Sequence, residues 1–172
     1  SPAGGDYRGE AGGETLFQQP AREKAQSTMS ELFQFADDFG PEKVIAIYQP
    51  KLGLRAIVVV DNVAAGPAIG GCCMAADATL EECARLARAM TMKNAAAGLP
   101  HGGAKSVIVA DPRMTSDSKE VIVRAFARAI RDLRDYIVGP DMGLNERAMA
   151  WAHDEIGRAV GKHAARFLAA RG

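Results

Sequence analysis

Three charged residues stand near glycines in this sequence, and their types could perform acid–base chemistry. Lys105 follows a Gly-Gly pair and opens a strand-like run, and Asp141 lies between Gly139 and Gly143. Glycines allow the backbone to approach a ligand closely. A lysine that loses solvent favours its neutral amine, which can accept a proton, whereas a cationic lysine can meet a carboxylate. Together Lys93, Lys105 and Asp141 indicate a lysine–carboxylate site.

Each of these residues also has an ordinary structural explanation, and the spacing alone leaves both interpretations open. Lys93 falls at the margin of the apolar stripe of its expected helix, where a lysine can extend past its neighbours to solvent. Lys105 could be a solvated lysine at a strand end, and Asp141 could serve the turn that precedes a helix. His101 has no identifiable partner in the sequence, and we interpret it as incidental.

An α/β domain is expected to position these residues, because strand-like and helix-like segments alternate along the chain. β-type runs at 44–48 and 54–60 predict an antiparallel hairpin, and 62–71 continues as an extended segment. Helices are expected over about 80–97, about 118–134 and from 145 to at least 160, with short strands over 105–110 and 136–138. This order predicts a mixed, mostly parallel sheet with an N-terminal antiparallel hairpin and helices on both faces, and no dinucleotide-binding domain.

Local signals refine where the helices begin. Thr79 and Glu82 form a capping-box pattern, and Asp117 and Glu120 stand in the same register. The first helix has one expected apolar stripe, made of Leu80, Cys83, Leu86, Ala87, Met90 and Ala97. In an open α/β sheet, ligands bind beyond the carboxyl ends of the strands, so we expect segments 66–71, 93–105 and 139–143 to converge there.

Composition excludes several classes of protein. The 172 residues contain 21 Lys+Arg and 21 Asp+Glu, and this zero net charge argues against a nucleic-acid or membrane-surface partner. The apolar runs are too short for a transmembrane helix. Cys72, Cys73 and Cys83 form neither a disulfide framework nor a four-ligand zinc site, so we expect a cytoplasmic chain without a bound metal.

Four segments taken together resemble the Glu/Leu/Phe/Val amino-acid dehydrogenases. The pattern Leu-x-x-Gly-Gly-Ala-Lys-x-Val-x-x-x-Asp-Pro at 99–112 is similar to that family's active-site signature. The segment 139–143 resembles its later aspartate motif, and 66–71 and 90–94 also match. The similarity covers about residues 30–160, and it is to the N-terminal domain, which binds substrate and forms the dimer.

The resemblance implies a role for each of the residues above. Lys93 would hold the α-carboxylate of the substrate, Lys105 would be the catalytic lysine that activates water, and Asp141 would move protons to and from the amino group. Gly70 and Gly71 would form the close-approach turn beside the substrate. The implied reaction oxidises an L-amino acid with NAD or NADP to an imine, which is hydrolysed to a 2-oxo acid and ammonia.

The sequence departs from the family pattern at three places. Ile69 stands where glutamate-specific members carry a lysine, so the resemblance implies an apolar substrate side chain, which Met90 would also contact. Cys73 stands where the family usually has arginine. The family continues into a dinucleotide-binding domain, whereas residues 162–172 predict an alanine-rich helical tail.

We therefore expect a disordered leader over 1–28, a dehydrogenase N-terminal domain over 29–161 and an atypical helical tail over 162–172. The leading hypothesis is the substrate domain of an NAD(P)-dependent dehydrogenase for an apolar L-amino acid, truncated and inactive alone, with no cofactor-binding residues of its own. Expected partners are a small L-amino acid or 2-oxo acid and further copies of the chain. The alternative is a non-catalytic oligomerisation or amino-acid-binding module.

Overall fold

A computed structural model describes residues 33–160 of the chain. The expected leader over 1–28 and the expected tail over 162–172 lie outside these residues. The chain divides after Gln34, and the domain described below comprises residues 35–160. In the described residues, no helix is long and apolar enough to cross a membrane.

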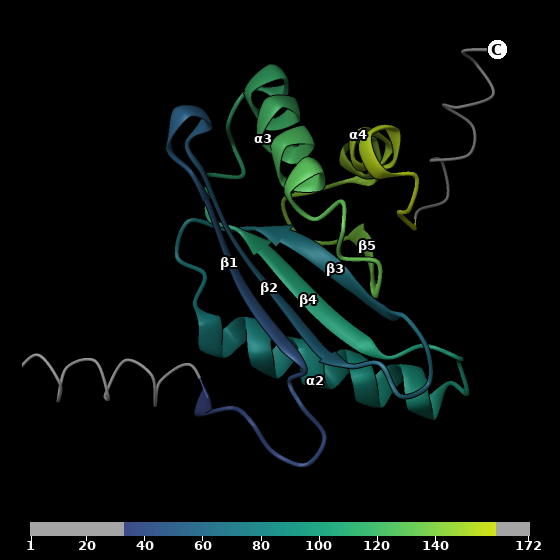
Figure 1. The fold of residues 1–172 in the computed structure, drawn as a ribbon. Coiled ribbons are helices and arrows are strands. Elements are labelled where there is room, and N and C mark those ends of the chain that lie inside the picture. Colours follow the sequence, from purple (N-terminus) through teal and green to yellow (C-terminus); the bar gives the residue numbers. More distant parts are fainter. Residues whose placement is uncertain (1–32, 161–172) are drawn as a thin grey trace, which may run out of the picture. The chain divides into compact units, whose positions relative to one another are not determined.

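The domain is built on one five-stranded sheet with the strand order β1-β2-β4-β3-β5 (Figure 1). The strands are β1 (Lys43–Gln49), β2 (Leu54–Asn62), β3 (Ala68–Met74), β4 (Gly103–Ile108) and β5 (Tyr136–Pro140). The hairpin of β1 and β2 turns through the short 3-10 helix η1 (Pro50–Leu52), and β2 also pairs antiparallel with β4. The strand β3 pairs in parallel with both β4 and β5. The predicted mixed sheet with its N-terminal hairpin is confirmed.

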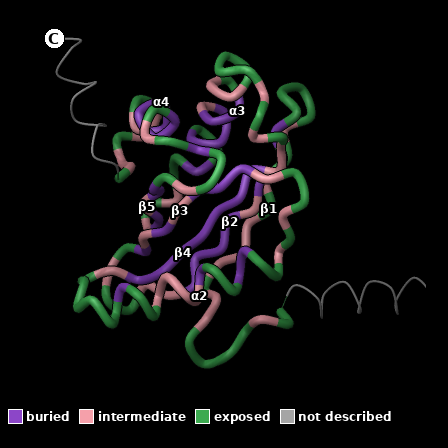
Figure 2. The backbone as a smooth tube through the Cα atoms, turned by 180° about the vertical axis from the view of Figure 1, so that it is seen from behind, coloured by how far each residue is buried: buried purple, intermediate pink, exposed green. Residues whose placement is uncertain are grey.

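Helices cover both faces of this sheet, as predicted (Figure 1). The helix α2 (Leu80–Ala96) packs on one face through a small cluster that includes Cys83, Ala87 and Val107. The helices α3 (Ser116–Ala129) and α4 (Glu146–Ile156) pack on the other face, where the larger core lies. The buried backbone follows the inner strands β2, β4 and β3, so the sheet centre is the most protected part of the domain (Figure 2).

The ends of several elements differ from the sequence-based expectation. The helix α3 is capped by Thr115, whose side chain accepts from the Ser118 N–H at 3.3 Å, rather than by Asp117. The helix α4 ends before Gly157, which adopts a left-handed φ of 68°, and does not reach Val160. The backbone N–H of Val160 instead donates to the carbonyl of Val138 in β5 at 2.9 Å.

The buried face of α2 is also rotated from the expected stripe. The N-cap at Thr79 is confirmed, since its side chain accepts from the Glu82 N–H at 3.1 Å. Leu86, however, is 36% exposed, whereas Asn94 is buried. Because α2 approaches the sheet mainly through small residues, the larger Leu86 lies outside the contact.

Two arginines join segments that are distant in the sequence. Arg88 of α2 makes two 3.0 Å hydrogen bonds to the buried carboxylate of Asp61 and also pairs with Asp37. Arg158 donates to three backbone carbonyls, those of Ile130, Leu133 and Tyr136. Arg158 therefore holds the end of α3 and the start of β5 together.

Candidate active site

The centre of the candidate site is a contact between Lys105 and Asp141. Lys105 lies in β4, where it is 6% exposed and opposite Val59 of β2. Asp141 follows β5 directly and closes a turn with Leu144. The Lys105 Nζ forms an ion pair with Oδ2 of Asp141, and the second carboxylate oxygen accepts from the Met142 N–H at 2.8 Å. The structure thus brings together two of the residues that the sequence singled out.

Gly71 of β3 makes this contact possible, because β3 lies between the strands that lead to the two charged residues. A Cβ at Gly71 would lie 2.2 Å from Oδ2 of Asp141, which is far inside van der Waals contact. A Cβ at Gly70 would lie 1.6 Å from the carbonyl oxygen of Ala104 in β4. Both glycines are therefore required by close approach, one to a side chain and one to backbone.

The electrostatics of Asp141 show that two lysines influence it. Burial alone would raise the pKa of the Asp141 carboxyl. The hydrogen bonds from Lys105 and from the Met142 N–H, together with the charges of Lys105 and Lys93, outweigh this effect and lower the pKa. The carboxylate is therefore ionised at neutral pH, and Lys93 is close enough for its charge to act on it.

The other predicted substrate residues belong to α2 and β3. Lys93 is exposed near the end of α2, and Met90 is half-buried one turn earlier. Ile69 is half-buried in β3, where it is aligned with Ile137 of β5. Both isoleucines are thus only partly covered by the rest of the domain.

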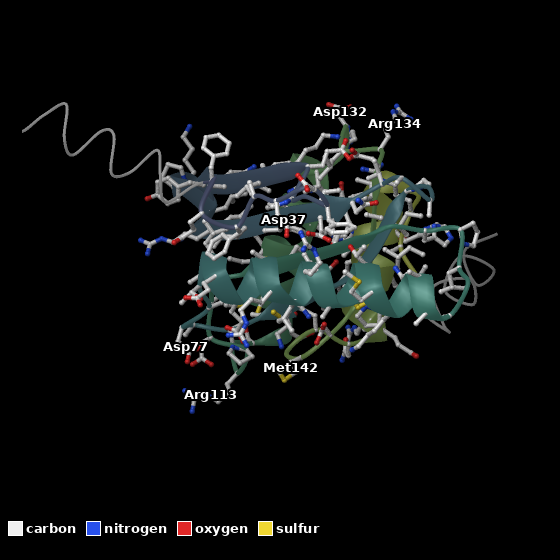
Figure 3. All side chains as sticks on the ribbon, turned by 90° about the horizontal axis from the view of Figure 1, so that it is seen from below. Asp37, Asp77, Arg113, Asp132, Arg134 and Met142 are labelled. Atoms are coloured by element: carbon white, nitrogen blue, oxygen red, sulfur yellow. The ribbon has the colours of Figure 1, made fainter. Side chains whose placement is uncertain are left out.

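The turn after β5 leaves Met142 on the outside of the domain. Its side chain is 73% exposed and projects away from the ribbon, on the same side of the view as Arg113 (Figure 3). Asp132 and Arg134, which precede β5, lie on the opposite side of that view. The end of β5 that carries Asp141 is thus accessible from solvent.

His101 and the cysteines have structural surroundings. The Nδ1 atom of His101 lies 3.0 Å from the carbonyl oxygen of Pro67, so the ring connects the two loops that precede β3 and β4. Cys73 is buried in the cluster beneath α2, and burial raises the pKa of its thiol despite the nearby charge of Lys105. Burial also raises the pKa of Cys72 and of Cys83 to about 12. The thiols therefore stay protonated and unreactive.

Sequence reasoning missed a buried polar network behind the site. The hydroxyls of Ser106 and Tyr136 lie 2.8 Å apart, and the Tyr136 hydroxyl donates to the carbonyl of Gly70 at 3.3 Å. These residues belong to the parallel strands β4, β5 and β3. Lys105 lies in β4, Gly71 lies in β3, and Asp141 directly follows β5. A serine within an apolar buried strand was the available signal, since a buried hydroxyl needs a partner.

The arrangement can perform proton transfer close to an exposed cation. Lys105 Nζ and Asp141 Oδ2 are in direct contact, so a proton can pass between them when a reacting group displaces one partner. Lys93 offers an exposed cation next to them. In residues 33–160, no group of three or more His, Cys, Asp or Glu side chains could hold a metal ion.

The chain is similar in sequence and fold to amino-acid dehydrogenases. Residues 41–158 match the family described as Glu/Leu/Phe/Val dehydrogenase, dimerisation domain. The chain is 40% identical over 136 residues to leucine dehydrogenase of Bacillus subtilis, an alignment that covers 76% of this chain and 37% of that protein. It is 38% identical over 122 residues to phenylalanine dehydrogenase of Thermoactinomyces intermedius, which covers 68% of this chain and 33% of that one.

A solved structure shows the same fold. The L-tryptophan dehydrogenase of Nostoc punctiforme superposes with a TM-score of 0.67 at 26% identity, over 77% of this chain and 39% of that one. The present chain spans 33–39% of the length of these relatives.

Proposed function

Because the chain belongs to the Glu/Leu/Phe/Val dehydrogenase family and matches its N-terminal dimerisation domain, we propose that it supplies the substrate site of an L-amino-acid dehydrogenase. The reaction is the oxidative deamination of an apolar L-amino acid to a 2-oxo acid and ammonia, with NAD or NADP as oxidant. The observation that carries this proposal is the Lys105–Asp141 pair beside Gly71, with Lys93 close enough to act on the same carboxylate.

In this proposal Lys93 binds the α-carboxylate of the substrate. Its ammonium is exposed at the end of α2 and close to Asp141, so a zwitterionic ligand can place its carboxylate on Lys93 and its amino group toward Asp141. An ammonium–carboxylate hydrogen bond is of the stronger, charge-assisted kind. The two charges thereby set the orientation of the Cα between them.

Lys105 and Asp141 carry out the proton transfers. Asp141 Oδ2 accepts a proton from the substrate amino group and later returns one to the departing ammonia. Lys105 Nζ, in its neutral form, accepts a proton from the water that attacks the oxidised carbon. Lys105 is buried and in direct contact with Asp141, so a proton that Asp141 takes from the substrate removes the carboxylate charge beside the lysine.

The described residues do not form the kind of turn that binds the nicotinamide cofactor that this chemistry requires. A dinucleotide is normally held by a Gly-rich turn between a strand and a helix N-terminus. Of the strand-to-helix connections within 33–160, the one after β5 begins α4 at Asn145, whose own side chain already accepts from the Ala148 N–H. Substrate binding and proton transfer are the parts of the reaction that this chain's own side chains perform.

The proposed substrate is apolar because of Ile69. An isoleucine at this position offers no charge to a side-chain carboxylate, and burying an unpaired carboxylate costs several kcal/mol. A hydrophobic contact gives about 0.8 kcal/mol for each buried methylene. Leucine or phenylalanine should therefore bind better than glutamate.

Ligand binding by the 172-residue chain tests this proposal. Calorimetry should show that L-leucine binds more tightly than L-glutamate and that Lys93→Gln weakens leucine binding about tenfold, the loss of one charge-assisted bond. The matched control is Lys51→Gln, which alters an exposed lysine of η1. Ile69→Lys should move the preference toward glutamate. Equal binding of leucine and glutamate, or an equal effect of both lysine variants, would contradict the proposal.

We further propose that the domain forms homo-oligomers through the free edge of β1. This strand pairs only with β2 among the described residues, and Tyr48 on it is 64% exposed. An exposed edge strand offers unpaired backbone groups to a second copy. Sedimentation should show self-association that Ala46→Pro weakens. Self-association without any amino-acid binding would favour the non-catalytic alternative.

A further inference from the structure

One backbone carbonyl, that of Gly102, joins the three segments that surround the candidate site. The side-chain amide of Asn94 in α2 donates to this oxygen at 2.7 Å, and the backbone N–H of Ile69 in β3 donates to it at 3.0 Å. Gly102 immediately precedes β4 and also donates its own N–H to the carbonyl of Gly66 at 3.2 Å. Helix, loop and strand therefore meet at a single atom.

The side chain of Asn94 is buried, with an exposed fraction of 5%. An asparagine is a poor residue for the interior of a helix, and an apolar side chain would fill the same space without needing a partner. Gly102 itself packs closely on the sheet, because a Cβ at this position would lie only 1.6 Å from the carbonyl oxygen of Asn62 in β2. The amide therefore attaches α2 to a fixed point of the sheet.

The residues adjacent to this junction are those of the candidate site. Asn94 directly follows Lys93, and Ile69 directly precedes Gly70 and Gly71. Gly102 lies three residues before Lys105. A change in the distance between Asn94 and Gly102 would therefore move Lys93 relative to the strands that carry the other site residues.

We propose that Asn94 is a positioning residue, whose amide fixes the end of α2 that carries Lys93 relative to Ile69 and Lys105. This inference rests on the proposed function for its biological meaning. Its geometry, however, can be tested in the 172-residue chain without any ligand, so the failure of amino-acid binding would leave the outcome of the test unaffected.

The experiment replaces Asn94 by leucine, which is similar in size and cannot donate a hydrogen bond. Loss of the bond should increase local opening of this junction about tenfold, so the Ile69 amide should exchange its hydrogen about tenfold faster. A ¹³C NMR titration should show a higher pKa for the Asp141 carboxyl than in the parent chain, because Lys93 no longer stays near it. Acetylation of Lys105, measured relative to exposed Lys51, should be faster by a similar factor.

The matched control is Thr115→Val, because Thr115 also bonds a backbone group through its side chain, the Ser118 N–H at 3.3 Å, but at the start of α3 on the other face of the sheet. This variant should leave the Ile69 exchange rate and the Asp141 titration unchanged. Asn94→Asp serves as a second variant, in which a carboxylate faces the Gly102 carbonyl and should produce the same local changes.

Four outcomes would overturn the proposal. The first is a folded Asn94→Leu chain with unchanged Ile69 exchange and unchanged Asp141 titration. The second is a uniform rise of exchange and acetylation rates that only follows the loss of global stability. The third is an equal effect of Thr115→Val. The fourth is failure of both Asn94 variants to fold, which would show that the residue supports the whole domain rather than this junction.

Discussion

Replacing Gly71 by alanine should separate the Lys105–Asp141 pair while leaving the backbone unstrained. The added Cβ would lie 2.2 Å from Oδ2 of Asp141 and 2.9 Å from its Cβ and Cγ. Ordinary contact begins at 3.4 Å, so the carboxylate must move away by about 1 Å. The same oxygen accepts from Lys105, and the hydrogen bond is lost when the carboxylate moves.

The expected loss in the free energy of unfolding depends on how deeply Lys105, which loses its partner, is buried. The Lys105 side chain is 8% exposed, whereas that of Asp141 is 27% exposed and can relax toward solvent. Removing one partner of a fully buried pair costs about 3–5 kcal/mol, and because Asp141 stays nearby we expect about 2 kcal/mol. A glycine-to-alanine change without a clash has the opposite sign and stabilises by about 0.4–1 kcal/mol.

Urea denaturation followed by circular dichroism at pH 7.5 measures the difference in the free energy of unfolding between the variant and the parent chain. Acetylation with mass spectrometry measures the reactivity of Lys105 relative to Lys51. Gly139→Ala is the matched control, because Gly139 is aligned with Gly71 on the neighbouring strand. A Cβ at Gly139 meets the end of the Val160 side chain at 3.0 Å and lies at an ordinary contact distance of 3.7 Å from the Gly70 carbonyl oxygen. The control should have unchanged or slightly higher stability and unchanged Lys105 reactivity.

The reasoning is refuted if Gly71→Ala has the stability and Lys105 reactivity of the parent chain. It is equally refuted if Gly139→Ala destabilises the domain as much, since the effect would then belong to the paired strands and not to the ion pair. A loss of stability with unchanged Lys105 reactivity would show that the carboxylate had moved together with the lysine.

Three further changes test other parts of the structure. Tyr136→Phe removes the hydroxyl that pairs with the buried Ser106 hydroxyl, and it should lower the free energy of unfolding, measured in urea, by about 1–2 kcal/mol. The double variant with Ser106→Ala should lose less stability than the sum of the two single variants. Arg158→Lys cannot reach all three of its carbonyl partners and should lower the same free energy by about 2 kcal/mol, so an unchanged midpoint would contradict the role assigned to it. Hydrogen bonds from Arg88 lower the pKa of Asp37 to about 2, and the pKa of Asp141 is lowered as well, so the unfolded chain binds protons first on acidification. The free energy of unfolding should therefore be constant between about pH 5 and about pH 8 and decrease as the pH falls through 4 toward 2, with a smaller decrease in Asp37→Asn; a rise on acidification would be inconsistent with these shifts.

Local signals in the sequence were sufficient to predict the helices and strands and the types of the residues at the site. The capping box at Thr79 and Glu82 marks the start of α2, because its hydrogen bonds involve neighbouring residues only. The hairpin of β1 and β2 follows from two apolar runs with a short connection. The motifs around Lys93, Lys105 and Asp141 indicated the family through their residue types and spacing, and residues 41–158 match that family.

Interactions between distant segments were decided only by the tertiary structure. The position of β3 between β4 and β5 depends on parallel pairing across long connections, for which the strand sequences carry no register signal. The rotation of α2, which buries Asn94 and exposes Leu86, depends on how closely small residues let the helix approach the sheet. The end of α4 at Gly157 was a local signal that the apolar periodicity obscured.

The contact between Lys105 and Asp141 shows most clearly what the sequence determined and what only the tertiary structure determined. The sequence by itself determined that two lysines, an aspartate and a Gly-Gly pair are present with the spacing of the family. It did not determine that Asp141 touches Lys105 across β3, because this contact requires a strand order and a missing side chain at Gly71 to occur together. The residue types can be identified from the sequence directly. The two residues are 36 positions apart, and they come into contact only when the sheet forms.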